Sequence, residues 1–312
     1  MNRNLKRGTL IFGIAMPVFI LSGVLFYINY ESTGGSMHPD IKRPGTVASI
    51  EDLEFREEIF EGISDNAPVY RSDIDVERSI RNASACIGVD IKDLDYTYMP
   101  GQINTRKYKL PGGMLYLTES TGYWNYKSDT SSSEDGVVAE KFISDDEIKV
   151  KTSELIKSYD LLDGKSYNVS MGSSTTCGWN SPEKIMSKDV YVYPNIDDKE
   201  VYGVDRMIIS YDSEGNIIEI FYCCNPVSKV TDVALKSADA VKKALDAGDY
   251  SAALSYSMKS ADIRSVKLAY YADSAPNHKG KLYIYPVYVL TAEGTGISND
   301  TEEFDIIVDA VA

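Results

Sequence analysis

The sequence predicts an α+β fold, with one N-terminal transmembrane helix followed by repeated helix-plus-antiparallel-sheet modules. Three observations support this prediction. Residues 8–30 contain no charged side chain. Three later segments have apolar residues at helical spacing. After each of them come segments in which apolar and polar residues alternate, as they do in a half-buried strand.

Residues 8–30 are long enough for a transmembrane anchor, because about 20 helical residues cross the hydrocarbon core of a bilayer. Arg3, Lys6 and Arg7 precede this run. The positive-inside rule therefore predicts a single-pass protein of the cell membrane, with residues 1–7 in the cytoplasm and an extracellular C-terminal domain. A cleaved signal peptide is the alternative, but the apolar run is longer than usual and no A-x-A-like site follows it.

The rest of the chain is predicted to consist of a linker and three units. Residues 31–50 are rich in Gly, Pro, Ser and Thr, which is typical of a linker. The three α+β modules are expected at residues 51–135, 136–228 and 229–312. The alternative is a single α+β domain in which helices and hairpins alternate without repeating.

Capping residues mark the predicted helices. A serine can accept hydrogen bonds from the free N–H groups of the first turn, and a glycine readily adopts the left-handed conformation after the last turn. The helices are expected between Ser72 and Gly88, between Ser144 and Gly164, and between Ser237 and Gly248. In the second helix Ser144 and Glu147 have the spacing of a capping box.

Two strand predictions carry specific detail. Met207–Tyr211 and Ile217–Cys224 are expected to form a hairpin, since a polar, glycine-containing turn separates them. Pro286 lies inside a further predicted strand, Lys281–Leu290. Because proline has no backbone N–H, it predicts an edge or a bulge at this position.

The composition excludes one class of partner and argues against another. The chain has 47 acidic and 32 basic residues, a formal net charge of −15. Nucleic acid is not an expected partner, because its binding requires Lys and Arg contacts to phosphates. The acidic balance also argues against a protein that lies flat on anionic lipid.

The four cysteines do not predict a metal site or a cofactor. There is no C-x-x-C, and both histidines are far from any cysteine in the sequence. Cys223 and Cys224 end a predicted strand, where neighbouring side chains face opposite sides. Cys177 lies in a loop of the same unit, so a disulfide from Cys177 to Cys223 or Cys224 is predicted. Buried reduced thiols are the alternative.

The chain is predicted not to be an enzyme. Ser181 and Lys184 match the S-x-x-K pattern, but its S-D-N and K-T-G partners are absent from the sequence. A Ser or Cys triad needs a histidine base, and His38 and His278 lie in a linker and a polar turn. A hydrolase with dispersed acidic residues remains an alternative, since acids are too numerous for one pair to stand out.

Tyrosine is frequent, with 23 residues, and five tyrosines gather on two predicted strands. The five are Tyr270, Tyr271, Tyr283, Tyr285 and Tyr288. Because tyrosine combines an apolar ring with a polar end, this group predicts a binding surface, with ordinary sheet packing as the alternative. Tyr283 and Tyr285 are expected on one face of the strand, and Tyr288 on the other.

The segments 201–221, 238–245, 266–271 and 285–289 resemble the YycH/YycI group of Gram-positive regulators, and more broadly PepSY-type modules. This resemblance covers roughly residues 140–292. It implies a non-enzymatic, membrane-anchored extracytoplasmic protein of the cell envelope that modulates a sensor kinase or another membrane protein. The second hypothesis is a module that binds cell-wall glycan or peptide through the tyrosine-rich surface.

Overall fold

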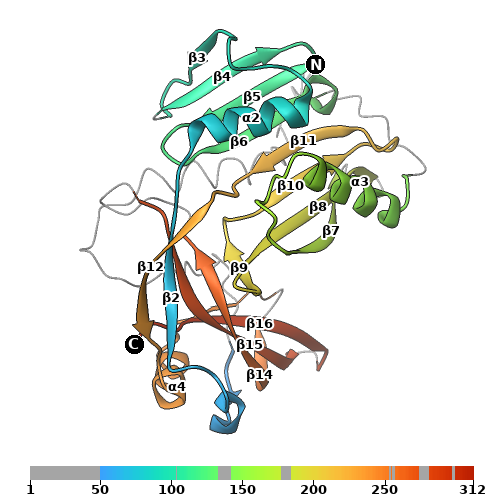
Figure 1. Ribbon diagram of the computed structural model, residues 1–312. Coiled ribbons are helices and arrows are strands. Elements are labelled where there is room, and N and C mark those ends of the chain that lie inside the picture. Colours follow the sequence, from blue (N-terminus) through green and yellow to red (C-terminus); the bar gives the residue numbers. More distant parts are fainter. Residues whose placement is uncertain are drawn as a thin grey trace, which may run out of the picture.

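The protein is mainly a β structure. The computed structural model describes residues 50–102, 104–132, 142–176, 184–252, 254, 257–273, 281–296 and 299–312. Within these residues the chain forms one mixed sheet of sixteen strands together with three α-helices (Figure 1). Strand makes up 51% of the structure.

The prediction of repeated helix-plus-sheet modules is wrong. Strands of different predicted units pair directly: β6 (Tyr123–Ser128) with β11 (Ile217–Tyr222), and β2 (Asn66–Ser72) with both β12 (Val227–Ala234) and β15 (Tyr283–Gly296). The alternation of apolar and polar residues indicates which side chains point inward. It does not determine which strand lies beside which, so strands from all three units join one sheet.

The upper half of the sheet in Figure 1 has the strand order β7-β8-β10-β11-β6-β5-β4-β3. The strands not yet located are β3 (Tyr96–Tyr98), β4 (Thr105–Leu110), β5 (Gly113–Thr118), β7 (Tyr167–Thr176), β8 (Lys184–Ile196) and β10 (Met207–Tyr211). The helices α2 (Val76–Ile87) and α3 (Asp145–Ser158) contribute Ile80 and Ile148 to a core that includes Trp124 and Ile209 of the strands. Both helices therefore cover the same face of this half.

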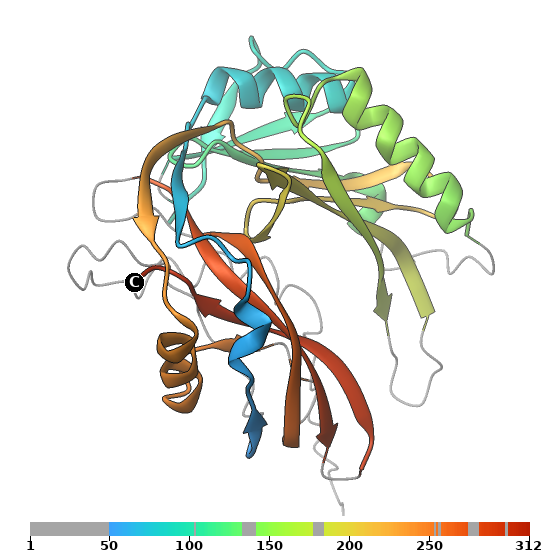
Figure 2. The ribbon, with the colours of Figure 1, turned by 60° about the horizontal axis from the view of Figure 1, so that its bottom comes forward.

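The lower half contains β2, β12, β15 and the remaining strands. These are β1 (Leu53–Glu54), β9 (Lys199–Gly203), β13 (Ser251–Ala252), β14 (Met258–Ala272) and β16 (Thr301–Asp309). The helix α4 (Ala238–Asp246) and the 3-10 helix η1 (Glu57–Phe60) pack on a second core with Leu290 and Ile306, while a 3-10 turn, η2 (Asp129–Ser132), follows β6. Figure 2 shows α2 and α3 at the top and α4 at the lower left.

The helix caps confirm part of the sequence prediction. Ser144 and Glu147 form the predicted capping box of α3, and Ser237 caps α4. Gly88 follows α2 in the left-handed conformation, with φ of 72°. The prediction of Ser72 as a cap is wrong, because Ser72 belongs to β2 and Asp75 accepts the capping hydrogen bond from the Arg78 N–H. The helix α3 also ends at Ser158, before the predicted Gly164.

The predicted hairpin is confirmed, since β10 and β11 pair in antiparallel fashion from Met207 opposite Tyr222. Pro286 lies inside β15, which has neighbours on both sides, and not on a sheet edge. Pairing with β2 ends at Ile284 and pairing with β16 begins at Val287. Pro286, which has no backbone N–H, thus lies between the residues of β15 that pair with β2 and those that pair with β16.

The prediction of a single-pass membrane protein is contradicted in the part of the chain that the structure describes. No helix there is long and apolar enough to cross a membrane. Residues 8–30, on which that prediction depends, lie outside the described residues, as do residues 1–7 and nearly all of the predicted linker.

Candidate functional site

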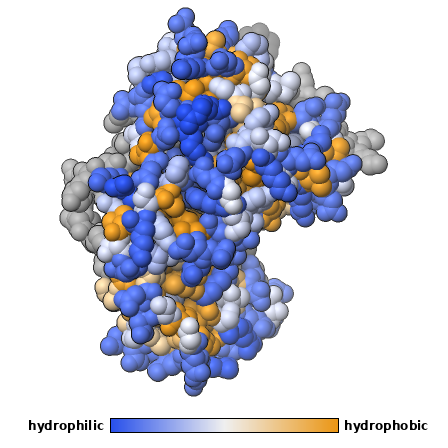
Figure 3. All heavy atoms as spheres, viewed as in Figure 1, coloured by the Kyte–Doolittle hydropathy of each residue, from blue (hydrophilic) through white to orange (hydrophobic). Residues whose placement is uncertain are grey.

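One face of the upper half carries no α-helix in the described part of the chain. Side chains on the other face, such as Val190, Ile209 and Trp124, pack into the core with α2 and α3. Because successive residues of a strand alternate between faces, the residues between them point away from both helices. We call this second surface the helix-free face. Figure 3, viewed as in Figure 1 with α2 and α3 toward the viewer, shows the opposite, helix-bearing side, which is mostly hydrophilic with smaller hydrophobic patches.

A row of directly paired residues crosses the helix-free face of the upper half. Opposite residues in antiparallel strands lie side by side on the same face. From β4 to β7, the register places in one row Lys107, Tyr116, Asn125, Phe221, Ile208, Tyr191 and Ser170. The row thus combines large apolar side chains with polar side chains at both ends.

The helix-free face continues into the lower half. Near the end of β8, Ile196 points to the helix-bearing side and packs with Val201 of β9. The next residue, Tyr202, therefore points to the helix-free face, where it lies beside Tyr271, and Tyr271 lies beside Tyr285. The aromatic residues of the whole face are Tyr116, Tyr123, Tyr191, Tyr193, Tyr202, Phe221, Tyr271, Tyr283 and Tyr285.

Most of these rings are half-buried, because they lie against the sheet. The Tyr191 ring lies over Gly172 of β7, where an added Cβ atom would be 2.8 Å from the ring carbon Cε2. Burial, together with the nearby carboxylate of Asp189, raises the pKa of Tyr191 above its usual value. Tyr191 therefore offers a neutral ring and a protonated hydroxyl to anything that contacts this face.

Charged residues surround the aromatic rings in the lower half. The Tyr202 hydroxyl donates a hydrogen bond to Glu200 Oε2 at 2.9 Å, and a longer one to Asp305 Oδ2 at 3.5 Å. Lys267 forms an ion pair with Glu200 and lies 5.8 Å from the centroid of the Tyr202 ring. Burial and the bond to Glu200 raise the pKa of Tyr202 far above its usual range. The charges in this part are therefore paired with one another.

Four chain segments cross between the two halves, from β2 to α2, from β8 to β9, from β9 to β10 and from β11 to β12. Asp205 lies on the third crossing and is only 3% exposed. Its Oδ2 atom has no hydrogen-bond partner among the described residues. Burial raises the pKa of Asp205 to about 7, although Lys165 and Arg78 act in the opposite direction. We call this region the junction.

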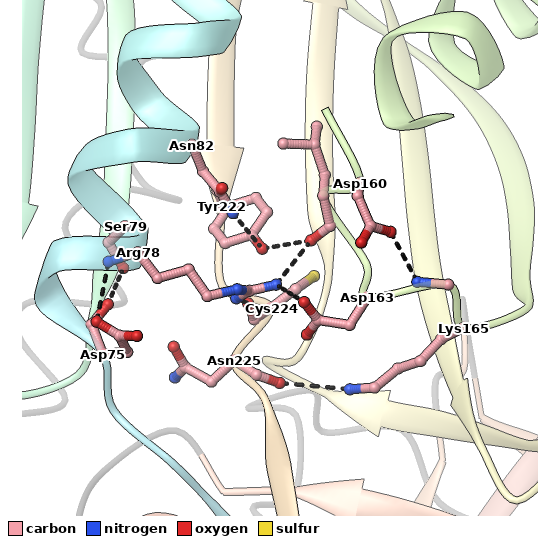
Figure 4. A network of polar contacts seen from close by, with 12 residues as sticks. Asp75, Arg78, Ser79, Asn82, Asp160, Asp163, Lys165, Tyr222, Cys224 and Asn225 are labelled. Carbon is pink, nitrogen blue, oxygen red and sulfur yellow. Dashed lines mark hydrogen bonds and ion pairs between the residues drawn. The ribbon is translucent and has the colours of Figure 1, made fainter. Parts of the chain in front are cut away.

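Arg78 of α2 ties the junction together (Figure 4). Its guanidinium donates hydrogen bonds to the backbone oxygens of Leu161 and Cys224, both at 3.2 Å, and forms an ion pair of 2.8 Å with Asp163. The Tyr222 hydroxyl donates to the same Leu161 oxygen at 2.6 Å. One side chain thus connects α2, the loop after α3 and the β11–β12 crossing. These contacts satisfy backbone oxygens and indicate a structural role.

The junction does not have the features of a nucleophilic site. Burial raises the pKa of the Cys223 and Cys224 thiols well above the usual value. A catalytic cysteine needs the opposite shift, because the thiolate is the reactive form. Across the described ranges, no group of three or more His, Cys, Asp or Glu residues could hold a metal ion. His38 and His278 lie outside these ranges.

The structure divides the five predicted tyrosines between two faces. Tyr271, Tyr283 and Tyr285 lie on the helix-free face, where Tyr285 is nevertheless buried at 4% exposed, and the rings of Tyr283 and Tyr285 are 5.9 Å apart. Tyr270 and Tyr288 belong to cores on the helix-bearing side and are 1% and 2% exposed. The five do not form one surface, because Tyr270 and Tyr271 are neighbours on a strand and point in opposite directions.

Cys223 and Cys224 are buried thiols in the structure, and Cys86 is also a free thiol. Cys177, the third residue of the predicted disulfide, lies outside the described residues. The disulfide therefore stays a prediction.

Sequence reasoning did not identify the part of the helix-free face that lies in the upper half. The signal was present in β8, where Tyr191 and Tyr193 alternate with the buried Val190 and Val192. Aromatic residues on the outer positions of a predicted strand can indicate a second, functional face. What the sequence does not contain is the pairing of β8, β10 and β11 that brings Tyr191 and Phe221 into one row.

Comparisons with known proteins do not identify a family. No family model matches the chain, and no curated protein matches it. One similar solved structure is an uncharacterized protein from Eubacterium rectale ATCC 33656, which shares 8% sequence identity over 82% of this chain and 85% of that chain, with a TM-score of 0.43. A likeness at this level supports no functional argument. The resemblance to the YycH/YycI group stays a prediction from the sequence.

Proposed function

We propose that this chain is a binding protein without catalytic activity, and that a polypeptide partner contacts its helix-free face. The observation that carries the proposal is the in-register row from Lys107 to Ser170, in which Tyr116, Phe221 and Tyr191 are spaced across the upper half. Aromatic residues are enriched where proteins bind one another, and polar neighbours provide orientation at the rim.

The dimensions of the row favour a macromolecule over a small ligand. Six strand spacings separate β4 from β7, which corresponds to a width of about 29 Å. Small ligands usually occupy concave pockets that enclose most of their surface, whereas protein partners cover broad faces. The mixture of tyrosine, serine and asparagine also resembles the composition of surfaces that bind proteins through rigid rings and adaptable hydrogen bonds.

Site-specific crosslinking tests this proposal. Benzoylphenylalanine replaces Tyr116 or Tyr191 on the helix-free face, or Tyr159, which is 45% exposed at the end of α3 and serves as the control. After irradiation of cells that express the full chain, the first two positions are expected to yield the same crosslinked polypeptide, identified by mass spectrometry. The control position is expected to yield none. Crosslinks of equal strength at Tyr159 would contradict the proposal.

The partner identified in this way allows an affinity measurement. We expect Tyr116→Ala and Tyr191→Ala each to weaken binding about 30-fold, since a central aromatic residue of an interface contributes about 2 kcal/mol. Tyr159→Ala is expected to bind as the wild type does. Circular dichroism establishes that each variant is folded. Unchanged affinity in folded variants would show that these rings only pack against the sheet.

A further inference from the structure

The outer edge of β7 is an unusual feature of this sheet. In the described part of the chain, β7 pairs with β8 and with no other strand. The strand has ten residues, YNVSMGSSTT, and none of them is charged or a proline. A free edge presents unpaired N–H and C=O groups that can pair with another strand. Proteins usually protect such edges with charges, prolines or short strands.

Other edges of the sheet carry these protective features. On β12, Lys229 and Asp232 form an ion pair of 2.9 Å, and a register irregularity interrupts pairing with β2 between Lys229 and Thr231. The edge strand β3 has only three residues. Within the described residues, β7 is therefore the long edge without charge, although the chain as a whole has a net charge of −15.

Exposed apolar side chains gather beside the same edge. Val169 of β7 is 37% exposed and Ile185 of β8 is 41% exposed. On α3, Val150 is 55% exposed. The helix lies next to β7, since the Tyr167 hydroxyl bonds to Ser153 Oγ at 3.2 Å. These side chains gain burial when another element covers the edge.

We propose that β7 pairs with β7 of a second copy of this chain, in antiparallel orientation about a twofold axis perpendicular to the sheet. The occupant is inferred from β7 itself. Its ten residues carry no charge, so two copies can approach at this edge without like-charge contacts, although each chain has a net charge of −15. Antiparallel pairing of identical strands is self-complementary, as a closed twofold interface requires.

This arrangement has a consequence for the helix-free face. A twofold axis perpendicular to the sheet keeps both helix-free faces on the same side of the dimer. Asn168, Ser170 and Gly172 of each copy then lie where the two faces meet, because they alternate with residues on the helix-bearing side. The dimer thus presents one continuous face across both copies. The pairing is inferred from the edge alone and does not depend on the proposed partner.

Sedimentation equilibrium of the full-length chain over a range of concentrations tests the pairing. We expect a reversible dimer, and we expect Val169→Lys to weaken it at least tenfold, because each copy then places a positive charge on the paired edge, as natural edge strands do to prevent pairing. Val230→Lys is the matched control: Val230 is 46% exposed on the charged edge strand β12, and this change is expected to leave the dimer intact.

Hydrogen exchange provides a second measurement that does not depend on the variants. Amides of β7 that point away from β8 are expected to be protected at high protein concentration and to exchange faster on dilution. A wild-type chain that stays monomeric at all concentrations would overturn the proposal, even if β7 captures a strand of another protein. A dimer that Val169→Lys does not weaken, with unprotected β7 amides, would place the interface elsewhere and overturn it as well.

Discussion

Replacing Asp205 with asparagine is expected to remove a pH dependence from the stability of this protein. Asp205 is 3% exposed at the junction, and burial raises its pKa from 3.8 to about 7. Lys165 and Arg78 partly oppose this shift, and the backbone N–H of Asn225 donates a hydrogen bond to the carboxyl group. The buried thiols of Cys223 and Cys224 and the hydroxyl of Tyr123 also face it.

The sign of the effect follows from proton linkage. Between pH 3.8 and about 7 the folded chain holds a proton on Asp205 that the unfolded chain has lost. The stabilising contribution is therefore complete below the unfolded pKa and is lost as pH rises toward 7. From pH 5 to 7, the free energy of unfolding is expected to fall by about 2–3 kcal/mol through this group, at about 1.4 kcal/mol per pH unit.

Urea denaturation at pH 5, 6, 7 and 8 measures this contribution as the difference between wild type and Asp205→Asn. Asparagine has nearly the same shape and no charge to bury, so the variant is expected to gain stability relative to wild type as pH rises. Asp246→Asn makes the same chemical change at a side chain that is 66% exposed on α4. Parallel pH profiles for wild type and Asp205→Asn would show that the buried carboxyl does not titrate in this range.

Local elements were predictable from the sequence because local chemistry determines them. The capping box of Ser144 and Glu147 brings both ends of two hydrogen bonds within three residues, so spacing alone identifies it. The hairpin of β10 and β11 likewise depends on a short polar turn. The prediction of Ser72 as a helix cap was wrong because Asp75, three residues later, competes for the same role and β2 extends to Ser72.

Pairing over long distances was not predictable in the same way. The long strand β15 has the neighbours β14, β2 and β16, which come from different parts of the chain. Its apolar residues indicate burial but contain no information about which strand lies alongside. The candidate site depends on this pairing, since Tyr191 and Phe221 become neighbours in a row only through β10. Which of Tyr270 and Tyr271 is buried was not predictable either. Strand alternation places the two rings on opposite faces, but the position of the helices decides which face is covered.

Replacing Arg78 with alanine is expected to lower the free energy of unfolding by about 2–4 kcal/mol. The Arg78 side chain is 12% exposed, and its removal leaves the Cys224 backbone oxygen without the Arg78 donor and the Leu161 oxygen with Tyr222 alone. Unsatisfied buried acceptors account for most of the cost, because Asp163, at 40% exposed, can be hydrated. A second variant, Arg78→Lys, keeps the positive charge but loses the planar guanidinium group. Its free energy of unfolding is expected to lie between those of the wild type and Arg78→Ala.

Arg264→Ala is the matched control for this change. Arg264 also contacts two acids, Asp262 at 2.7 Å and Glu293 at 3.2 Å, but its side chain is 51% exposed. Exposed ion pairs contribute little, so its loss is expected to cost less than about 1 kcal/mol. Urea denaturation of the three variants and the wild type at one pH gives the comparison. If Arg78→Ala and Arg264→Ala cost the same, the contacts of Arg78 with backbone oxygens are not what joins α2 to the β11–β12 crossing.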